Sequence, residues 1–167
     1  LIRSETVADH EAIRHVNQLA FGQKAEWQLV DELRDGGHSQ LSLVAEKDGQ
    51  IVGHIMFSDL QIHTSNGIVN SLALAPMAVL PGHQRQGIGS ALVRKGLMLC
   101  REQGHQSVVV LGHTDYYPRF GFSSELTKRI DSPFGGGEAW MAVELWPESL
   151  TGIQGWVEFS PPFGAFK

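Results

Sequence analysis

The amino-acid sequence predicts a mixed α/β fold, built as a single domain over residues 1–167. Two observations predict it. Segments of helical and of strand periodicity alternate along the chain, and two turn dipeptides, Asp48-Gly49 and Asn66-Gly67, are typical of antiparallel hairpins. Further on, a strand, a glycine-containing loop, an amphipathic helix and another strand follow one another in residues 68–111, which is the order of a β–α–β crossover with parallel strands.

The composition is that of a globular protein, with 42% hydrophobic and 19% charged residues. The net charge of -5 argues against a nucleic-acid partner, which needs a basic surface, and favours a cationic substrate. The single cysteine, Cys100, excludes an internal disulfide and a zinc site made of several thiolates. We find no signal peptide and no apolar run near the ~20 residues of a membrane span. We therefore expect a soluble, cytoplasmic protein without a membrane partner.

The first part of the chain is predicted to hold a short strand at residues 1–3 and two helices. Thr6 and Asp9 resemble a capping box, so the first helix is expected to follow them and to run through Ala20. The second helix is predicted from about Ala25 to the glycine pair at 36–37, because glycine commonly ends helices. Each helix has apolar residues at helical spacing and is expected to bury one face.

Several segments rich in apolar and β-branched residues are predicted strands. Residues 41–45 and 51–57 form the first hairpin, and a strand at residues 68–79 follows the second turn. Residues 107–111 form a mainly apolar, β-branched run, as expected of a strand buried on both faces. Residues 141–145 alternate and are predicted to form a later strand.

Between the strands at 68–79 and 107–111 lies an amphipathic helix that begins at two glycines and ends at Gly104. Its apolar side includes Cys100, which we interpret as a small buried hydrophobe and not as a nucleophile. A covalent intermediate on this thiol is therefore not expected.

The loop before this helix, residues 80–92 with the sequence LPGHQRQGIGSAL, is typical of an anion site. It is not a P-loop, because Ser90 follows the second glycine where a lysine is needed, and Leu92 stands where the dinucleotide fingerprint needs a glycine or alanine. Without Cβ atoms at Gly87 and Gly89, successive backbone N–H groups can close on a diphosphate at the helix N-terminus. Arg85 adds a full positive charge.

Two motifs in the order expected resemble the GNAT N-acetyltransferase family. They are Gln84-x-x-Gly87-x-Gly89, which resembles the acetyl-CoA pyrophosphate loop, and Tyr117-x-x-x-Gly121-Phe122, which follows the strand at 107–111. The Arg-Phe-Gly-Phe turn in the second motif is similar to that of the YhbS-like subgroup. The resemblance implies the acyl-CoA N-acyltransferase fold of this family, with a mixed central sheet, a splayed pair of parallel strands and flanking helices.

The resemblance also implies acetyl-CoA as co-substrate, no metal, and an amine of a small molecule or peptide as the acceptor in a ternary complex. Backbone groups at the end of the strand 68–79 would hold the pantetheine arm, and Pro76 would mark a bulge that frees an N–H for the acetyl carbonyl. Tyr117 is implied as the general acid, with a purely positional role as the alternative, and Gln84 is expected to shape the loop. The residues implied at the cofactor are Met77, Ala78, Val79, Gln84, Arg85, Gln86, Gly87, Ile88, Gly89 and Ser90.

Several points stay open at this stage. Val110 stands where many members of the family have an asparagine that holds the pantetheine arm, so the turn at 112–114 is the alternative. The sequence does not identify the general base. The candidates are His113, Asp115, His54 and Glu26, and the alternative is a water chain that leads to a more distant carboxylate. The alternative functions are a CoA-binding sensor or scaffold of the same fold and the transfer of another acyl group. A homodimer is left open.

Overall fold

The computed structural model describes all 167 residues, and they divide into two compact units. The first unit comprises residues 1–58 and 75–98, and the second comprises residues 59–74 and 99–167. The strands β3 and β4 and the helix α3 contribute residues to both units. The prediction of a single domain stays a prediction.

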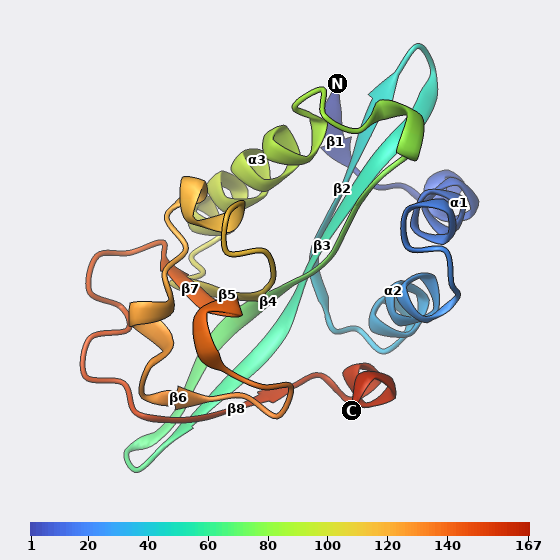
Figure 1. Ribbon diagram of the computed structural model, residues 1–167. Coiled ribbons are helices and arrows are strands. Elements are labelled where there is room, and N and C mark those ends of the chain that lie inside the picture. The colour runs from blue at the N-terminus through green and yellow to red at the C-terminus, as the bar shows by residue number, and fades with distance from the viewer. The chain divides into compact units, whose positions relative to one another are not determined.

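Three α-helices and eight strands make up the regular structure (Figure 1). The helices are α1 (His10–Phe21), α2 (Ala25–Asp35) and α3 (Ile88–Glu102). The strands are β1 (Ile2–Ser4), β2 (Ser39–Lys47), β3 (Gln50–Thr64), β4 (Gly67–Val79), β5 (Ser107–Leu111), β6 (Ile130–Asp131), β7 (Trp140–Glu144) and β8 (Gly155–Phe159). No helix has the length and apolar character that crossing a membrane requires.

The strands form one mixed sheet in the order β1-β2-β3-β4-β5-β7, with β8 paired to β3 and β6 paired to β8. The predicted crossover is confirmed, since β4 and β5 are parallel and α3 connects them. Their register covers only Leu72↔Val108 and Ala73↔Val109, although β4 continues to Val79. The two strands pair over only two residues and separate beyond Ala73, as expected for a splayed pair of parallel strands.

The hairpin of β2 and β3 closes with the predicted two-residue turn, in which Asp48 and Gly49 have φ angles of 52° and 77°. Positive φ at both central residues is the turn geometry that matches the twist of the two strands. Lys47 pairs with Gln50 beside the turn, and the register shifts between Ala45 and Glu46. The shift is a β-bulge that leaves Val52 of β3 without an opposite residue.

The first helix starts with a 3-10 turn, η1 (Val7–Asp9), before α1 begins at His10. The predicted capping box is confirmed, because the Asp9 carboxylate accepts a hydrogen bond of 2.7 Å from the Thr6 N–H. Helix α1 ends at Gly22, whose φ of 69° is left-handed, as is usual for a C-cap glycine.

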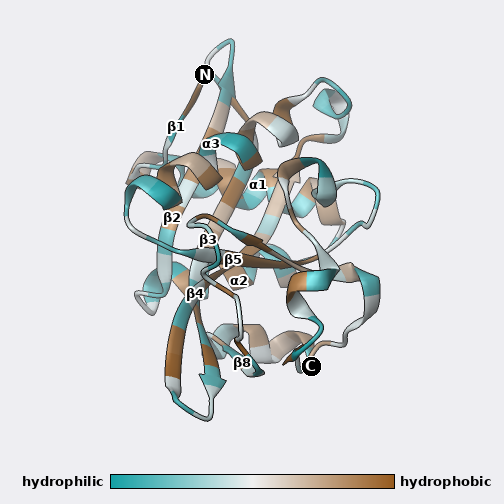
Figure 2. Cartoon of the chain, turned by 90° about the vertical axis from the view of Figure 1, so that its left-hand side faces the viewer, coloured by the Kyte–Doolittle hydropathy of each residue, from teal (hydrophilic) through white to brown (hydrophobic).

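In the first unit, α1 and α2 cover one face of the sheet and α3 covers the other (Figure 1). Hydrophobic residues follow the central strands, the helices alternate between hydrophobic and hydrophilic residues, and several turns are hydrophilic (Figure 2). Fully buried side chains from the two helices and the strands form the core of this unit, among them Ile13, Val16, Leu33, Leu43 and Ile55.

Two glycines bring α3 close to β3. A Cβ on Gly53 of β3 would lie 3.0 Å from Leu92 and 3.1 Å from Ile88 of α3. Conversely, a Cβ on Gly96 of α3 would lie 2.4 Å from the ring of Phe57 on β3. Each element therefore has a glycine where the other places a large side chain, and the beginning of α3 is packed tightly onto the strand.

Two strand predictions are corrected by the second unit. Strand β3 continues to Thr64, well beyond residue 57, because its last residues pair with β8, which the sequence did not predict. Their register includes Leu60↔Phe159. Strand β5 is buried at its centre, but Leu111 at its end is 46% exposed and not buried as predicted.

Replacement of Gly96 by alanine is expected to destabilise the protein by at least about 1 kcal/mol. Alanine is the better helix former, so an exposed site would gain up to about 1 kcal/mol from the same change. At Gly96 the new methyl group collides with the Phe57 ring, and the packing loss outweighs the gain. Urea unfolding measures the difference, with Lys95→Ala on the exposed side of α3 as the control. A Gly96→Ala variant as stable as the control variant would contradict the close packing.

Candidate functional site

The predicted phosphate loop connects β4 to α3 in the first unit. After the short 3-10 helix η2 (Pro81–His83), the chain turns at Arg85 and Gly87, whose φ angles are 64° and 83°. A left-handed backbone costs a residue with a Cβ roughly 1–2 kcal/mol. Glycine is therefore the suitable residue at position 87, and Arg85 is held in a costly conformation by the rest of the loop.

Three hydrogen bonds hold the loop in place. The Leu80 N–H donates to the Val52 carbonyl over 2.8 Å, and the His83 N–H donates to the Leu80 carbonyl over 2.8 Å. The side-chain amide of Gln84 donates to the Val79 carbonyl over 3.1 Å. Gln84 thus points back to the end of β4, which is the contact expected of a residue that shapes the loop.

The N-terminus of α3 presents backbone donors at this loop. The first bond within the helix runs from the Ala91 N–H to the Gly87 carbonyl over 3.0 Å. Earlier N–H groups of the first turn, such as those of Ile88 and Gly89, have no acceptor within the helix. Residues 84–87 are exposed. The partial positive charge of the helix N-terminus therefore faces an accessible loop, which is an arrangement that binds anions.

The end of β4 carries residues 77–79, to which the sequence assigned the pantetheine arm. They lie beyond the last residue of β4 that pairs with β5, Ala73. Ala78 and Val79 are buried, and Pro76 follows a cis peptide bond. The bulge expected at Pro76 stays a prediction.

In the second unit, Tyr117 begins the 3-10 helix η3 (Tyr117–Phe120) and is only 7% exposed. A Cβ on Gly112 would lie 2.5 Å from the Tyr117 ring, so the absence of a side chain there makes room for the ring. Gly121 ends η3 with a φ of 98°, and the turn buries Phe122 with its ring centre 5.6 Å from that of Tyr117. The spacing Tyr-x-x-x-Gly-Phe is thus the spacing of one short helix, its glycine cap and a core residue.

The surroundings of Tyr117 keep its hydroxyl protonated. Burial, and to a smaller extent the neighbouring Tyr116, raise the pKa of Tyr117 to about 12. The ring also meets the rings of Tyr116 and Phe120 edge-on, with centres 5.1 Å and 6.4 Å away. A phenol in such a setting carries its proton throughout the physiological pH range, which a proton donor requires.

Comparison with protein families decides the class. Residues 1–124 match the family model described as an acetyltransferase (GNAT) domain, which is well over half of the 167 residues. The chain belongs to the GNAT family of N-acetyltransferases.

Bacterial members of the family are similar to this chain over the whole of its length or over a large part of it. It is 33% identical over 168 residues to the uncharacterized N-acetyltransferase YhbS of Escherichia coli strain K12, covering 99% of both chains. It is 40% identical over 117 residues to YjhQ of the same strain, covering 69% of this chain and 65% of that protein. The predicted family, the mixed α/β fold and the N-acetyltransferase class are thereby confirmed.

Two solved structures of this family have closely similar folds. A crystal structure of YhbS from Escherichia coli in complex with CoA matches with a TM-score of 0.91 at 32% identity, covering 100% of this chain and 93% of that one. A GNAT family acetyltransferase from Brucella melitensis in complex with acetyl-CoA matches with a TM-score of 0.81 at 34% identity, covering 98% and 97%.

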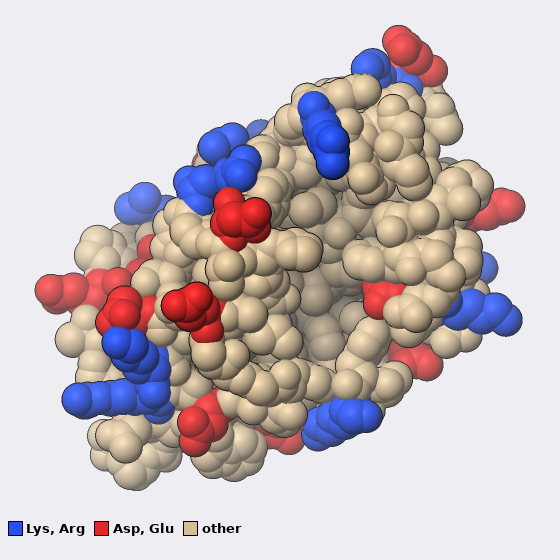
Figure 3. Space-filling model, in the orientation of Figure 1, with Lys and Arg blue, Asp and Glu red and all other residues tan.

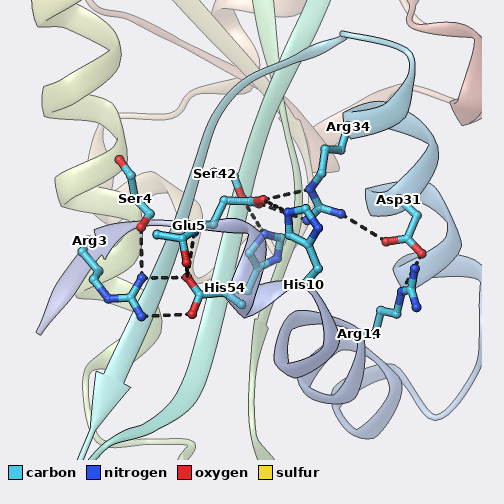
Figure 4. A network of polar contacts seen from close by, with 11 residues as sticks. Arg3, Ser4, Glu5, His10, Arg14, Asp31, Arg34, Ser42 and His54 are labelled. Carbon is cyan, nitrogen blue, oxygen red and sulfur yellow. Dashed lines mark hydrogen bonds and ion pairs between the residues drawn. The ribbon is translucent and has the colours of Figure 1, made fainter.

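The N-acetyltransferase has a buried polar network in its first unit that sequence reasoning did not find (Figure 4). His54, on β3, is fully buried between two partners. Its Nδ1 lies 3.3 Å from the Asn17 side-chain nitrogen, and its Nε2 lies 2.9 Å from the Ser42 hydroxyl. The amide nitrogen of Asn17 is a donor, so Nδ1 accepts and Nε2 carries the proton. Ser42 in turn donates to the Glu5 carboxylate.

Glu5 joins this network to the helices. Its carboxylate accepts a hydrogen bond of 2.8 Å from Arg34 of α2 and lies 2.9 Å from His10 of α1. Burial opposes ionisation of Glu5, but hydrogen bonds from Arg34 and Ser42 overcome it and lower its pKa. Two strands and both helices are therefore tied to one carboxylate.

These contacts remove His54 from the candidates for the general base. Burial lowers the pKa of His54 from 6.5 to about 4, so the ring stays neutral, and it has no exposed surface at which to take a proton from a substrate. Of the other candidates, His113 and Asp115 are exposed near η3, and Glu26 is half-buried and accepts a hydrogen bond of 2.9 Å from Gln23.

The second unit also has a cavity of about 550 Å³ between β8, the loop after β6 and the C-terminal 3-10 helix. Four aromatic residues, Phe134, Trp156, Phe159 and Phe163, line it together with polar and charged ones such as Asp131 and Glu158. Tyr117 is not part of its lining, and none of the residues predicted at the site lies there.

A pH dependence of stability is expected from His54. Between pH 6.5 and pH 4 the unfolded chain binds more protons at this residue than the folded protein, so the free energy of unfolding falls as the pH falls. From pH 7 to pH 4.5 we expect a loss of about 2 to 3 kcal/mol from this group alone.

Urea unfolding at several pH values measures the effect in the wild type, in His54→Gln and in His15→Gln, which replaces an exposed histidine. The slope should flatten only in His54→Gln. Equal slopes in all three proteins would contradict a neutral, buried His54.

Proposed function

We propose that this N-acetyltransferase transfers the acetyl group of acetyl-CoA to an amine of a small molecule or peptide by direct transfer in a ternary complex. The observation that carries the proposal is the exposed loop 84–87, which ends at the left-handed Gly87 and opens α3. The relatives from Escherichia coli and Brucella melitensis that were solved with CoA and acetyl-CoA support the choice of co-substrate.

The loop and the first turn of α3 hold the diphosphate of the co-substrate. Backbone N–H groups from Arg85 to Ser90 are the donors, and the guanidinium of Arg85 adds charge. A diphosphate gains both from the hydrogen bonds and from the helix dipole, and neither needs a metal ion. Gln84 keeps the loop open by its bond to Val79.

The end of β4 orients the thioester. Backbone groups of Met77 and Ala78 hold the pantetheine arm, and the Val79 N–H donates to the acetyl carbonyl. As the amine attacks, negative charge develops on that carbonyl oxygen. A donor already placed there is worth roughly 10²-fold or more in rate.

Tyr117 supplies a proton to the leaving group. The acceptor ammonium first loses one proton to water or to a base, and the free amine then forms a C–N bond with the acetyl carbon. The nitrogen loses a second proton to water or to the base as the C–S bond breaks. The sulfur takes the bonding electron pair, and the Tyr117 hydroxyl donates its proton to it. Burial of Cys100, which raises its thiol pKa to about 12, speaks against a covalent acetyl-enzyme, because the reactive form is the thiolate.

The acceptor is a cationic molecule in its free form. A primary amine is protonated at neutral pH, and the net charge of -5 favours its approach. Figure 3 shows both acidic and basic side chains, with several basic ones over α3, so the case for a partner other than nucleic acid rests on the net charge.

A CoA-binding sensor or scaffold is the second candidate function. The observation that favours it is Val110, a buried apolar residue where family members commonly have a polar one for the pantetheine arm. Release of CoA in the presence of an amine, measured on the purified protein, separates the two functions.

Gly87→Trp is expected to weaken acetyl-CoA binding by at least tenfold. A Cβ at this position would meet no atom within 4 Å, so the tryptophan side chain can extend into the space before the helix N-terminus. The matched control is Gly37→Trp, since Gly37 also has a left-handed φ, 75°, with open space around it. Both variants bear the same backbone cost, so calorimetric titration should separate them. Equal affinities would refute the loop as the diphosphate site.

Tyr117→Phe is expected to lower kcat about 10²-fold and to leave the KM for acetyl-CoA within about twofold. The phenyl ring keeps the packing against Phe122 and lacks only the proton. Thiol release in a panel of primary amines measures both constants, with Tyr116→Phe as the control. A wild-type kcat in Tyr117→Phe would exclude the general-acid role.

A further inference from the structure

We infer that Lys47, which lies outside the glycine loop in the sequence, is a further phosphate-binding residue of the co-substrate site. The inference rests on the proposed function, because it concerns the same loop. It extends the site to the hairpin of β2 and β3, which no sequence motif indicated.

The hairpin places Lys47 firmly. Lys47 is the last residue of β2 and pairs with Gln50 across the two-residue turn. Both turn residues have the positive φ angles of a two-residue hairpin turn, and this turn fixes the register in which Lys47 lies opposite Gln50. The bulge between Ala45 and Glu46 changes the alternation of side chains just before Lys47 and so sets the side of the sheet to which it points.

Two contacts connect this hairpin to the loop. The Lys47 ammonium donates to the side-chain oxygen of Gln86 over 3.3 Å. The carbonyl of Val52, the residue left unpaired by the bulge, accepts the hydrogen bond from the Leu80 N–H at the start of the loop. The ammonium is thus held beside the loop by a side chain of the loop itself.

The charge of Lys47 is available to a ligand. The neighbouring carboxylate, Glu46, is 2.9 Å from the Arg3 guanidinium and is occupied by it. Lys47 itself is exposed and has no carboxylate partner, and the same holds for Arg85. In a chain of net charge -5, two cations without a carboxylate partner therefore belong to this region: Arg85 within the loop, and Lys47, which is hydrogen-bonded to Gln86.

The chemistry of Lys47 suits a phosphate. An ammonium has three N–H donors and one goes to Gln86, so two are left for phosphate oxygens. CoA has two such groups, the diphosphate and the 3′-phosphate of its ribose. Because Lys47 is solvated, the contribution of its charge to binding is modest and is screened by salt.

Calorimetric titration with acetyl-CoA tests the inference. Lys47→Gln should weaken binding about three- to fivefold at low salt, and the difference should shrink as salt is added. Lys47→Arg should restore most of the affinity. Lys95→Gln, which removes the same charge from the exposed side of α3, should bind like the wild type. Thermal unfolding confirms that each variant is folded.

A second titration, with 3′-dephospho-acetyl-CoA, distinguishes the two phosphate groups. A loss that persists in Lys47→Gln assigns Lys47 to the diphosphate, and a loss that disappears assigns it to the 3′-phosphate. Equal affinities of wild type and Lys47→Gln for acetyl-CoA would overturn the inference while leaving the proposed function intact. Absence of binding in the wild type would instead overturn the proposed function itself.

Discussion

The close approach of α3 to β3 is the constraint on which the rest of the structure depends. The side chains of Leu92 and Ile88 on α3 pack against Gly53 of β3. The Phe57 ring of β3 packs against Gly96 of α3, so strand and helix are in close contact at both places. Ile88 is the first residue of α3, and the loop with Arg85 and Gly87 ends directly before it. A helix fixed at its first turn holds its N–H groups in one direction, and preorganised donors bind an anion without first being ordered.

The buried network supports the same sheet from its other face. The Glu5 carboxylate contacts residues of α1, α2 and β2. Its partner on β2, Ser42, is in turn hydrogen-bonded to His54 on β3. A buried charge left without its partners is costly, so these contacts favour one arrangement of helices and strands. Gly53 and His54 are neighbours on β3, and their side-chain positions lie on opposite faces of the sheet. The face with Gly53 packs against α3, and the face with His54 is connected to α1 and α2 by hydrogen bonds and ion pairs.

The sequence predicts those parts of the molecule that depend on local rules. Glycines at positions 37, 87, 104 and 121 have left-handed φ angles, and they are recognisable in the sequence because few other residues suit such a backbone. The long-range contacts were not recognisable from the sequence. Polar residues such as Ser58 and Asp59 end the apolar pattern of β3, yet the strand continues because β8 pairs with it. His54, Ser42 and Glu5 lie far apart in the sequence, and only the register of two strands brings them together.

The central claim is that the loop before α3 binds the diphosphate of acetyl-CoA. The most direct measurement is a pair of calorimetric titrations of the unmodified protein, one with acetyl-CoA and one with S-acetylpantetheine, which has the same thioester and no phosphate. We expect micromolar binding of acetyl-CoA and at least a hundredfold weaker binding of S-acetylpantetheine, which corresponds to about 3 kcal/mol of binding free energy from the nucleotide end. Equal binding of both, or of neither, would contradict it.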